Sequence, residues 1–234
     1  MNKTFGFSIH KVNSIRENLY NSSRTNRTTP NGYSVCRADP MKLLANFGSL
    51  KIQKGWILRA IQYYHSGNGH ARVFALPEGA PFPPTGQTLP DDRLPEEAVS
   101  NVMTLILGDH SPWSYLCASL FVREVGEFGA AWHGCSWSTH TLFGADLRVR
   151  ANHDSVNVAE ALPPSDEWVW KRALPRERDP HVVFGTKNVT VHFLTYSGLG
   201  RDTLFLHSDR YAQGGYVPRS LERELASGPG GYIF

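Results

Sequence analysis

At 234 residues, with 41% hydrophobic, 19% charged and 12% aromatic positions, the chain has the length and apolar content of one globular domain. This composition excludes a wholly disordered chain, and with only three cysteines and no glycine period or heptads it excludes disulfide-framework, collagen-like and coiled-coil proteins. No run approaches the roughly 18 apolar residues of a membrane-spanning helix. We therefore expect a soluble protein without a membrane partner, and no motif indicates a family.

The formal net charge is only +3, but it is unevenly distributed. Residues 1–37 contain six Lys and Arg against one Glu, a local charge of +5. A basic segment can bind the phosphates of nucleic acid, yet no interleaved aromatic residues or recognition motif accompany this one. We expect residues 1–38 to be a basic, partly mobile N-terminal arm. Nucleic-acid binding is not expected, and residues 1–37 are its only candidate.

The cysteines and the N-terminus bear on the compartment. Cys36, Cys117 and Cys135 are an odd number, widely separated, without a Cys-x-x-Cys pair, which favours reduced thiols over disulfides. Polar residues interrupt the N-terminal segment where a secretory signal needs an apolar run. The sequence predicts a cytoplasmic location.

Three segments carry helix signals: 39–48, 95–108 and 111–134. The first and third begin with a capping residue followed by proline, the second begins with proline and two glutamates, and each ends at glycine. In the third, apolar residues recur mainly at three- and four-residue steps. We expect the second and third to form a central helical pair.

Two β-hairpins are predicted from β-branched and aromatic runs that flank glycine-containing turns: 56–64 with 71–76, and 189–196 with 203–208. Segment 77–95 holds six prolines and is expected to be extended and at the surface.

The predicted class is therefore α+β, a largely antiparallel sheet built from the two hairpins and packed on one face by the helical pair. Residues 39–226 are expected to form a single domain, followed by a flexible, glycine-rich tail over 227–234.

Alternation along strands assigns the hairpin side chains to faces. In the second hairpin we expect Val191 and Phe193 to pack inward with Leu204 and Leu206. The other face then carries the polar and semi-apolar residues His192, Leu194, Tyr196, Phe205, His207 and Asp209. His192 would lie opposite His207, or opposite Asp209 in a register two residues longer.

In the first hairpin we expect one face to carry Arg59, Tyr63, His65, His70 and Arg72. His65 would oppose His70. Each imidazole pair is either a functional group or an exposed polar pair.

The densest group of reactive side chains runs from Trp132 to His140. The spacing of its histidines and Cys135 matches no structural zinc signature, and Cys135 follows a helix C-terminus, which disfavours a thiolate. We predict neither a metal site nor a cysteine nucleophile there. Ser138 and His140 share a strand face, with Trp137 behind it. The alternative is a helix end and strand packed by the two tryptophans, with satisfied polar groups.

Asp109 lies between the two predicted central helices. It either orients an imidazole or only satisfies turn backbone groups.

Two functions are consistent with these patterns. The first is a small-molecule enzyme of hydrolase or lyase type, with a histidine-lined pocket on the sheet face, bounded by segment 77–95. Its catalytic residues would be His133, His140, His192, His207 and Asp209. Its substrate-binding residues would be Tyr196, Ser138, Trp137 and Phe205.

The second function is a non-catalytic module that binds a ligand or a protein through exposed Trp, Tyr and Arg. The ten histidines favour the enzyme, provided that at least three of its imidazole and carboxylate groups converge in one concave site. The sequence indicates no cofactor and no oligomeric state.

Overall fold

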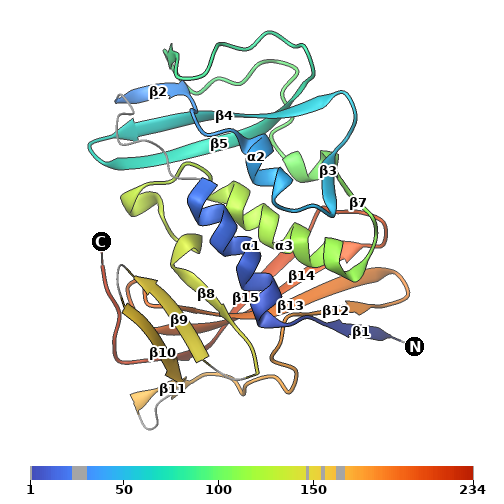
Figure 1. Ribbon diagram of the computed structural model, residues 1–234, viewed down its shortest axis with the longest axis vertical. Helices are drawn as coiled ribbons and strands as arrows, with labels where there is room; N and C mark the ends of the chain where they lie inside the picture. The colour runs from blue at the N-terminus through green and yellow to red at the C-terminus, as the bar shows by residue number, and fades with distance from the viewer. Residues whose placement is uncertain (1, 23–30, 146–147, 154–155, 162–166, 234) are drawn as a thin grey trace. The chain divides into compact units, whose positions relative to one another are not determined.

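The computed structural model describes residues 2–22, 31–145, 148–153, 156–161 and 167–233, and these are predominantly β (Figure 1). The chain divides into two compact units. Unit 1 comprises Met1–Ser14 and Ser138–Phe234, and unit 2 comprises Ile15–Trp137. Helix α1 (Ile9–Ser22) contributes residues to both units.

The predicted α+β class with a central helical pair is wrong. Residues 95–108 form no α-helix but a 3₁₀ turn over Val102–Leu105 and strand β7 (Ile106–Gly108), which pairs with β3 (Leu50–Ile52). The Val99 N–H donates to the Ala75 carbonyl and the Ala75 N–H donates to the Val99 carbonyl, each at 2.9 Å. Pairing with distant strands satisfies this backbone and overrides the local helix signals.

The two hairpins belong to different sheets, contrary to the single predicted sheet. The sheet of unit 1 runs in the order β1-β12-β13-β14-β15-β11, and β8 also pairs with β13. The strands of this sheet are β1 (Lys3–Gly6), β8 (His140–Phe143), β11 (Val169–Trp170), β12 (His181–Phe184), β13 (Asn188–Ser197), β14 (Thr203–Ala212) and β15 (Arg219–Ser227).

Two strands share one edge of β13. Strand β12 pairs with its first half and β8 with its second half. Strands β9 (Arg148–His153) and β10 (Val156–Ala161) form a separate pair.

The register of the β13–β14 hairpin differs by one residue from each of the two predicted registers. Ser197 pairs with Thr203, so that His192 lies opposite Ser208 and Phe193 opposite His207. A one-residue shift moves every side chain of one strand to the other face. Both faces of this sheet bury apolar side chains, so the apolar pattern does not specify the register.

The sheet of unit 2 runs in the order β5-β4-β2-β6. Its strands are β2 (Gly32–Val35), β4 (Trp56–His65), β5 (Asn68–Pro77) and β6 (Thr88–Leu89). The predicted faces of the β4–β5 hairpin are confirmed, but His70 pairs with Tyr63 and His65 with Asn68. This shift of two residues preserves the faces while separating the expected histidine pair.

Two predicted helix starts are confirmed. The Asp39 carboxylate accepts from the Met41 N–H (2.9 Å) at the start of α2 (Pro40–Ala45), and Ser111 caps α3 (Pro112–Gly126). Helix α3 ends at Gly126, well before the predicted end near residue 134. Trp132–Gly134 is a separate 3₁₀ turn, and so is Trp137–Thr139, where the sequence predicted a strand.

The proline-rich segment covers one face of the β4–β5 hairpin. Phe82, Leu89 and Leu94 pack against a buried cluster of Ile61, Phe74 and Leu76, with the rings of Phe74 and Phe82 5.5 Å apart. The same face carries Arg59, which follows from the alternation along β4.

The C-terminal segment is hydrogen-bonded to the β13–β14 loop. The Gly200 N–H donates to the Tyr232 carbonyl (2.7 Å), and the Tyr232 N–H donates to Gly198 (2.8 Å). In the basic N-terminal segment, Arg24 and Arg27 lie outside the described residues. Among the described residues, no helix has the length and apolar character that crossing a membrane requires.

Candidate functional site

Two of the predicted catalytic histidines meet in unit 1. His140 Nδ1 and His207 Nε2 each lie 2.8 Å from the Thr195 hydroxyl, and His207 Nδ1 lies 3.4 Å from a Glu222 carboxylate oxygen. These contacts link β8, β13, β14 and β15 through a chain of polar groups that is buried at His140, Thr195 and His207 and ends at the exposed Glu222. Thr195 was not predicted from the sequence, although it lies two residues from Phe193 and therefore on the same face of β13.

This chain is enclosed by aromatic rings. The Phe193 ring stacks on His207 at 4.7 Å, and the Phe205 ring lies 5.1 Å from His140. His207 has no exposed surface and His140 is 9% exposed. A buried, hydrogen-bonded chain of this kind rigidifies the sheet, and the catalytic role of His207 stays a prediction.

The remaining predicted catalytic residues are divided between the two faces of this sheet and unit 2. Asp209 is buried on the same face as His207, whereas His192 lies on the opposite face, where its Nδ1 is 2.9 Å from the Ser208 hydroxyl. His133 belongs to unit 2 and is exposed, and its Nε2 accepts from the indole N–H of Trp132 (3.0 Å). The enzyme hypothesis, which needs at least three convergent groups, stays a prediction.

Among the predicted substrate-binding residues of unit 1, Tyr196 and Phe205 lie on different faces of the sheet. The Tyr196 hydroxyl donates to Asp202 (2.5 Å), next to the β13–β14 loop. Ser138 is exposed, while Phe205 lies against His140. Their role in substrate binding stays a prediction.

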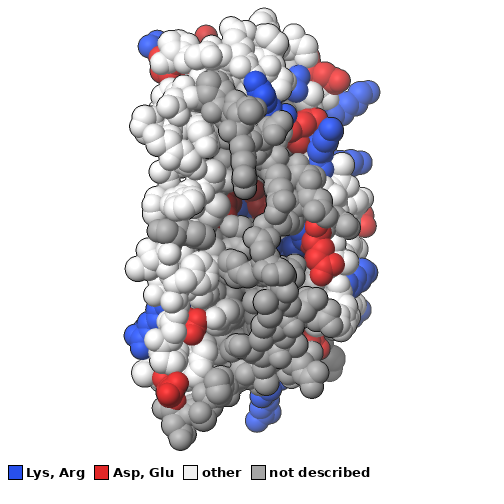
Figure 2. Space-filling view, turned by 60° about the vertical axis from the view of Figure 1, so that its left-hand side comes forward, with Lys and Arg blue, Asp and Glu red and all other residues white. Residues whose placement is uncertain are grey.

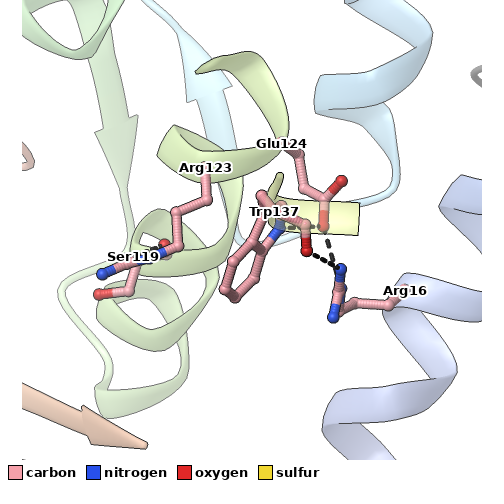
Figure 3. Close-up of polar contacts among 5 residues, drawn as sticks. All are labelled: Arg16, Ser119, Arg123, Glu124 and Trp137. Carbon is pink, nitrogen blue, oxygen red and sulfur yellow. Dashed lines mark hydrogen bonds and ion pairs between the residues drawn. The ribbon is translucent and has the colours of Figure 1, made fainter. Parts of the chain in front are cut away.

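Trp137 is held within unit 2 by charged groups from two helices (Figure 3). Its indole N–H donates to Glu124 (2.7 Å), and its carbonyl accepts from Arg16 (3.1 Å), which also pairs with Glu124 (3.1 Å). The guanidinium carbons of Arg16 and Arg123 lie 4.5 and 5.6 Å from the centre of the ring. This buried tryptophan therefore anchors the connection that follows α3.

Asp109 has the simpler of its two predicted roles. Its carboxylate accepts from the Ser111 N–H (3.0 Å), and hydrogen bonds from Ser111 lower the pKa of the Asp109 carboxyl. The carboxylate thus satisfies turn backbone at the start of α3.

Unit 2 contains a cavity of about 270 Å³. It is lined by residues 35–40, which run from the end of β2 to the start of α2, by residues 59–60 of β4 and by residues 82–85 of the proline-rich segment. A pocket was predicted beside this segment, but this cavity is lined by arginines in place of histidines.

Strand pairing brings two arginines to this cavity. Val35 pairs with Ile61, and the Cys36 N–H continues the ladder by donating to Ala60 (2.9 Å), which places Arg37 opposite Arg59. Both residues belong to the lining of the cavity. Neither guanidinium has a hydrogen bond or an ion pair with any residue that the structure describes.

Two other lining residues, Asp39 and Cys36, carry ionisable groups at the cavity. The Asp39 carboxylate is engaged as the cap of α2. Burial raises the pKa of the Cys36 thiol, which donates to Gln62 (3.5 Å) and adds no negative charge. Gly86, with φ +81°, leaves room for Arg37, because a Cβ there would lie 3.2 Å from the Arg37 Nε.

Other kinds of site find less support. No group of three or more His, Cys, Asp or Glu side chains in the described part of the chain is placed to hold a metal ion. On the face that Figure 2 presents, Lys and Arg side chains lie near Asp and Glu side chains, so no broad positive field covers its described part.

Comparison with known proteins adds no family. No family model matches the chain, and no curated protein or solved structure matches it significantly. The function must therefore be argued from the site itself.

Proposed function

We propose that this protein is a ligand-binding module that holds a small anion, a carboxylate or a phosphate, between Arg37 and Arg59. This is the non-catalytic function considered from the sequence, with arginine as the binding residue. The observation that carries the proposal is the opposition of Arg37 and Arg59 at one cavity, with no ion pair from either residue to a described acidic side chain, although Asp39 also lines the cavity.

The positive charges of Arg37 and Arg59 favour a bound anion. Like charges placed opposite each other on neighbouring strands repel and destabilise the sheet. An anion between Arg37 and Arg59 converts that repulsion into two attractions, and a guanidinium binds carboxylate or phosphate with two parallel hydrogen bonds.

The size and walls of the cavity limit the ligand. Drug-sized ligands typically occupy roughly 300–1,000 Å³, so a cavity of about 270 Å³ suits a smaller molecule. Phe82, three prolines, Val35 and two alanines supply the apolar part of the lining, which favours an anion that carries a short apolar body.

Titration calorimetry on the full-length protein tests the proposal. Inorganic phosphate and acetate are titrated separately into the wild type and into Arg37→Gln and Arg59→Gln. We expect one-to-one binding of at least one anion by the wild type, and a loss of about tenfold or more in each variant, because a charge-assisted hydrogen bond contributes roughly 1.5–3 kcal/mol.

The matched control is Arg219→Gln, which removes an exposed guanidinium from the other unit. Its affinity should equal that of the wild type. Equal binding by all four proteins, or no binding of either anion, would refute the proposal.

We also propose a cytoplasmic location. The support is that Cys36, Cys117 and Cys135, all of them described, form no disulfide, as is usual for proteins of a reducing compartment.

A further inference from the structure

A pair of imidazoles lies on the opposite face of the unit 1 sheet from His207. His181 of β12 and His192 of β13 are cross-strand partners, with ring centres 5.1 Å apart. Both are partly exposed. From the sequence, His192 was expected opposite His207 or Asp209, and His181 was not predicted as a functional residue.

Each ring is fixed through its Nδ1 atom. His181 Nδ1 lies 2.8 Å from the Asp179 carbonyl oxygen, which can only accept, so Nδ1 carries the proton and Nε2 of the neutral ring presents a lone pair. His192 Nδ1 lies 2.9 Å from the Ser208 hydroxyl. Neither Nε2 bonds to any residue in the described part of the chain.

Histidines that bind metals are usually held in this way, through a hydrogen bond at the nitrogen that does not face the metal. The spacing also fits. Metal–nitrogen bonds of about 2.0–2.1 Å place the centres of two imidazoles on one tetrahedral ion roughly 5 Å apart, and the observed separation is 5.1 Å.

The charge state of His192 suits a metal ligand. Burial is the main cause that lowers its pKa to about 4. The positive charges of Arg223 and of protonated His181 act in the same direction, whereas Asp209 acts in the opposite one. The ring is therefore neutral at pH 7, and a metal ion does not have to displace a proton from it. Arg223 opposes a bound cation, whereas Asp209 favours one.

We propose that His181 and His192 form a two-imidazole site for a divalent transition-metal ion of the Zn²⁺, Ni²⁺ or Cu²⁺ class. Imidazole nitrogen suits these ions, and Cu²⁺ binds most tightly in this series. Because no third protein ligand is placed nearby among the described residues, water completes the coordination. The site is independent of the anion-binding cavity, whose residues all belong to unit 2.

The test uses the full-length protein without an affinity tag, with Cu²⁺ as the probe at pH 7. Electron paramagnetic resonance with one equivalent of Cu²⁺ should show coupling to two imidazole nitrogens. Calorimetry should show an affinity at least tenfold lower in His181→Gln and in His192→Gln, since each variant loses one of two ligands. His65→Gln, an exposed histidine of unit 2, should bind like the wild type.

Coupling to two nitrogens that is lost in both variants supports the site. Coupling to one nitrogen or none, or affinities unchanged by both substitutions, overturns it. If a variant fails to fold, as judged by circular dichroism, the number of coupled nitrogens in the wild type decides the question.

Discussion

At the scale of single residues, Trp137 lies between two guanidinium groups and donates its indole N–H to Glu124 (Figure 3). Trp137→Phe removes the donor and part of the ring on which the guanidiniums stack. We expect the free energy of unfolding, measured with urea, to fall by about 1–3 kcal/mol. Trp132→Phe, at a residue that is 58% exposed, should change it by no more than about 0.5 kcal/mol. Similar losses in both variants would contradict the anchoring role.

The pKa of His192 gives a pH dependence with a definite sign. The folded state holds this pKa at about 4, below the value of 6.5 for a free side chain, chiefly through burial. Between pH 6.5 and 4 the unfolded state binds the proton and the folded state does not, so stability is complete above this window and decreases as the pH falls. Replacing the imidazole by Gln removes this contribution.

Urea unfolding at pH 7 and pH 4.5 measures this contribution of His192 to the free energy of unfolding. Between these two values, the wild type should lose on the order of 2 kcal/mol more than His192→Gln. Lys187→Gln, an exposed change in the turn before β13, should keep the wild-type difference. Parallel pH profiles for the wild type and His192→Gln would show that the ring is protonated equally in both states.

At the scale of elements, the Thr195 hydroxyl joins β8 to β14 through two buried imidazoles. Thr195→Val keeps the shape and the strand preference but removes one hydrogen-bond partner from each imidazole. We expect a loss of about 1–3 kcal/mol in the free energy of unfolding. Thr190→Val, on the opposite face of the same strand and partly exposed, should cost no more than about 0.5 kcal/mol. Equal stability of the two variants would mean that the hydroxyl contributes nothing to the sheet.

The same elements show which features local sequence patterns can predict. Caps at Asp39 and Ser111 act within a few residues, and both were predicted from the sequence alone. The hairpins were also predicted, because turn residues and β-branched runs are local. Strand register is different, since it depends on the closure of the loop and on what covers each face. In β4–β5 the predicted register was wrong by two residues, so the predicted faces were still correct. In β13–β14 it was wrong by one residue, so His192 lies opposite Ser208 and on the other face of the sheet from His207.

At the scale of the whole molecule, the candidate site depends on pairing between distant segments. Arg37 was counted with the basic N-terminal segment, and Arg59 was assigned to one face of a hairpin. Their opposition follows only from the pairing of β2 with β4. Strand β2 spans four residues, Gly32–Val35, which is too short for a clear alternation, so no sequence pattern predicted it. The cavity therefore could not be predicted from the sequence, because it depends on the pairing of β2 with β4.

The central claim is that Arg37 and Arg59 hold a small anion in the cavity of unit 2. The most direct measurement is an NMR titration of the full-length protein with inorganic phosphate and, separately, acetate, following the backbone amides and the arginine Nε–H groups. We predict saturable shifts confined to residues 35–40, 59–60 and 82–85 and to the side chains of the two arginines. Absence of shifts with both anions, or shifts spread over the exposed lysines and arginines of both units, would contradict the account.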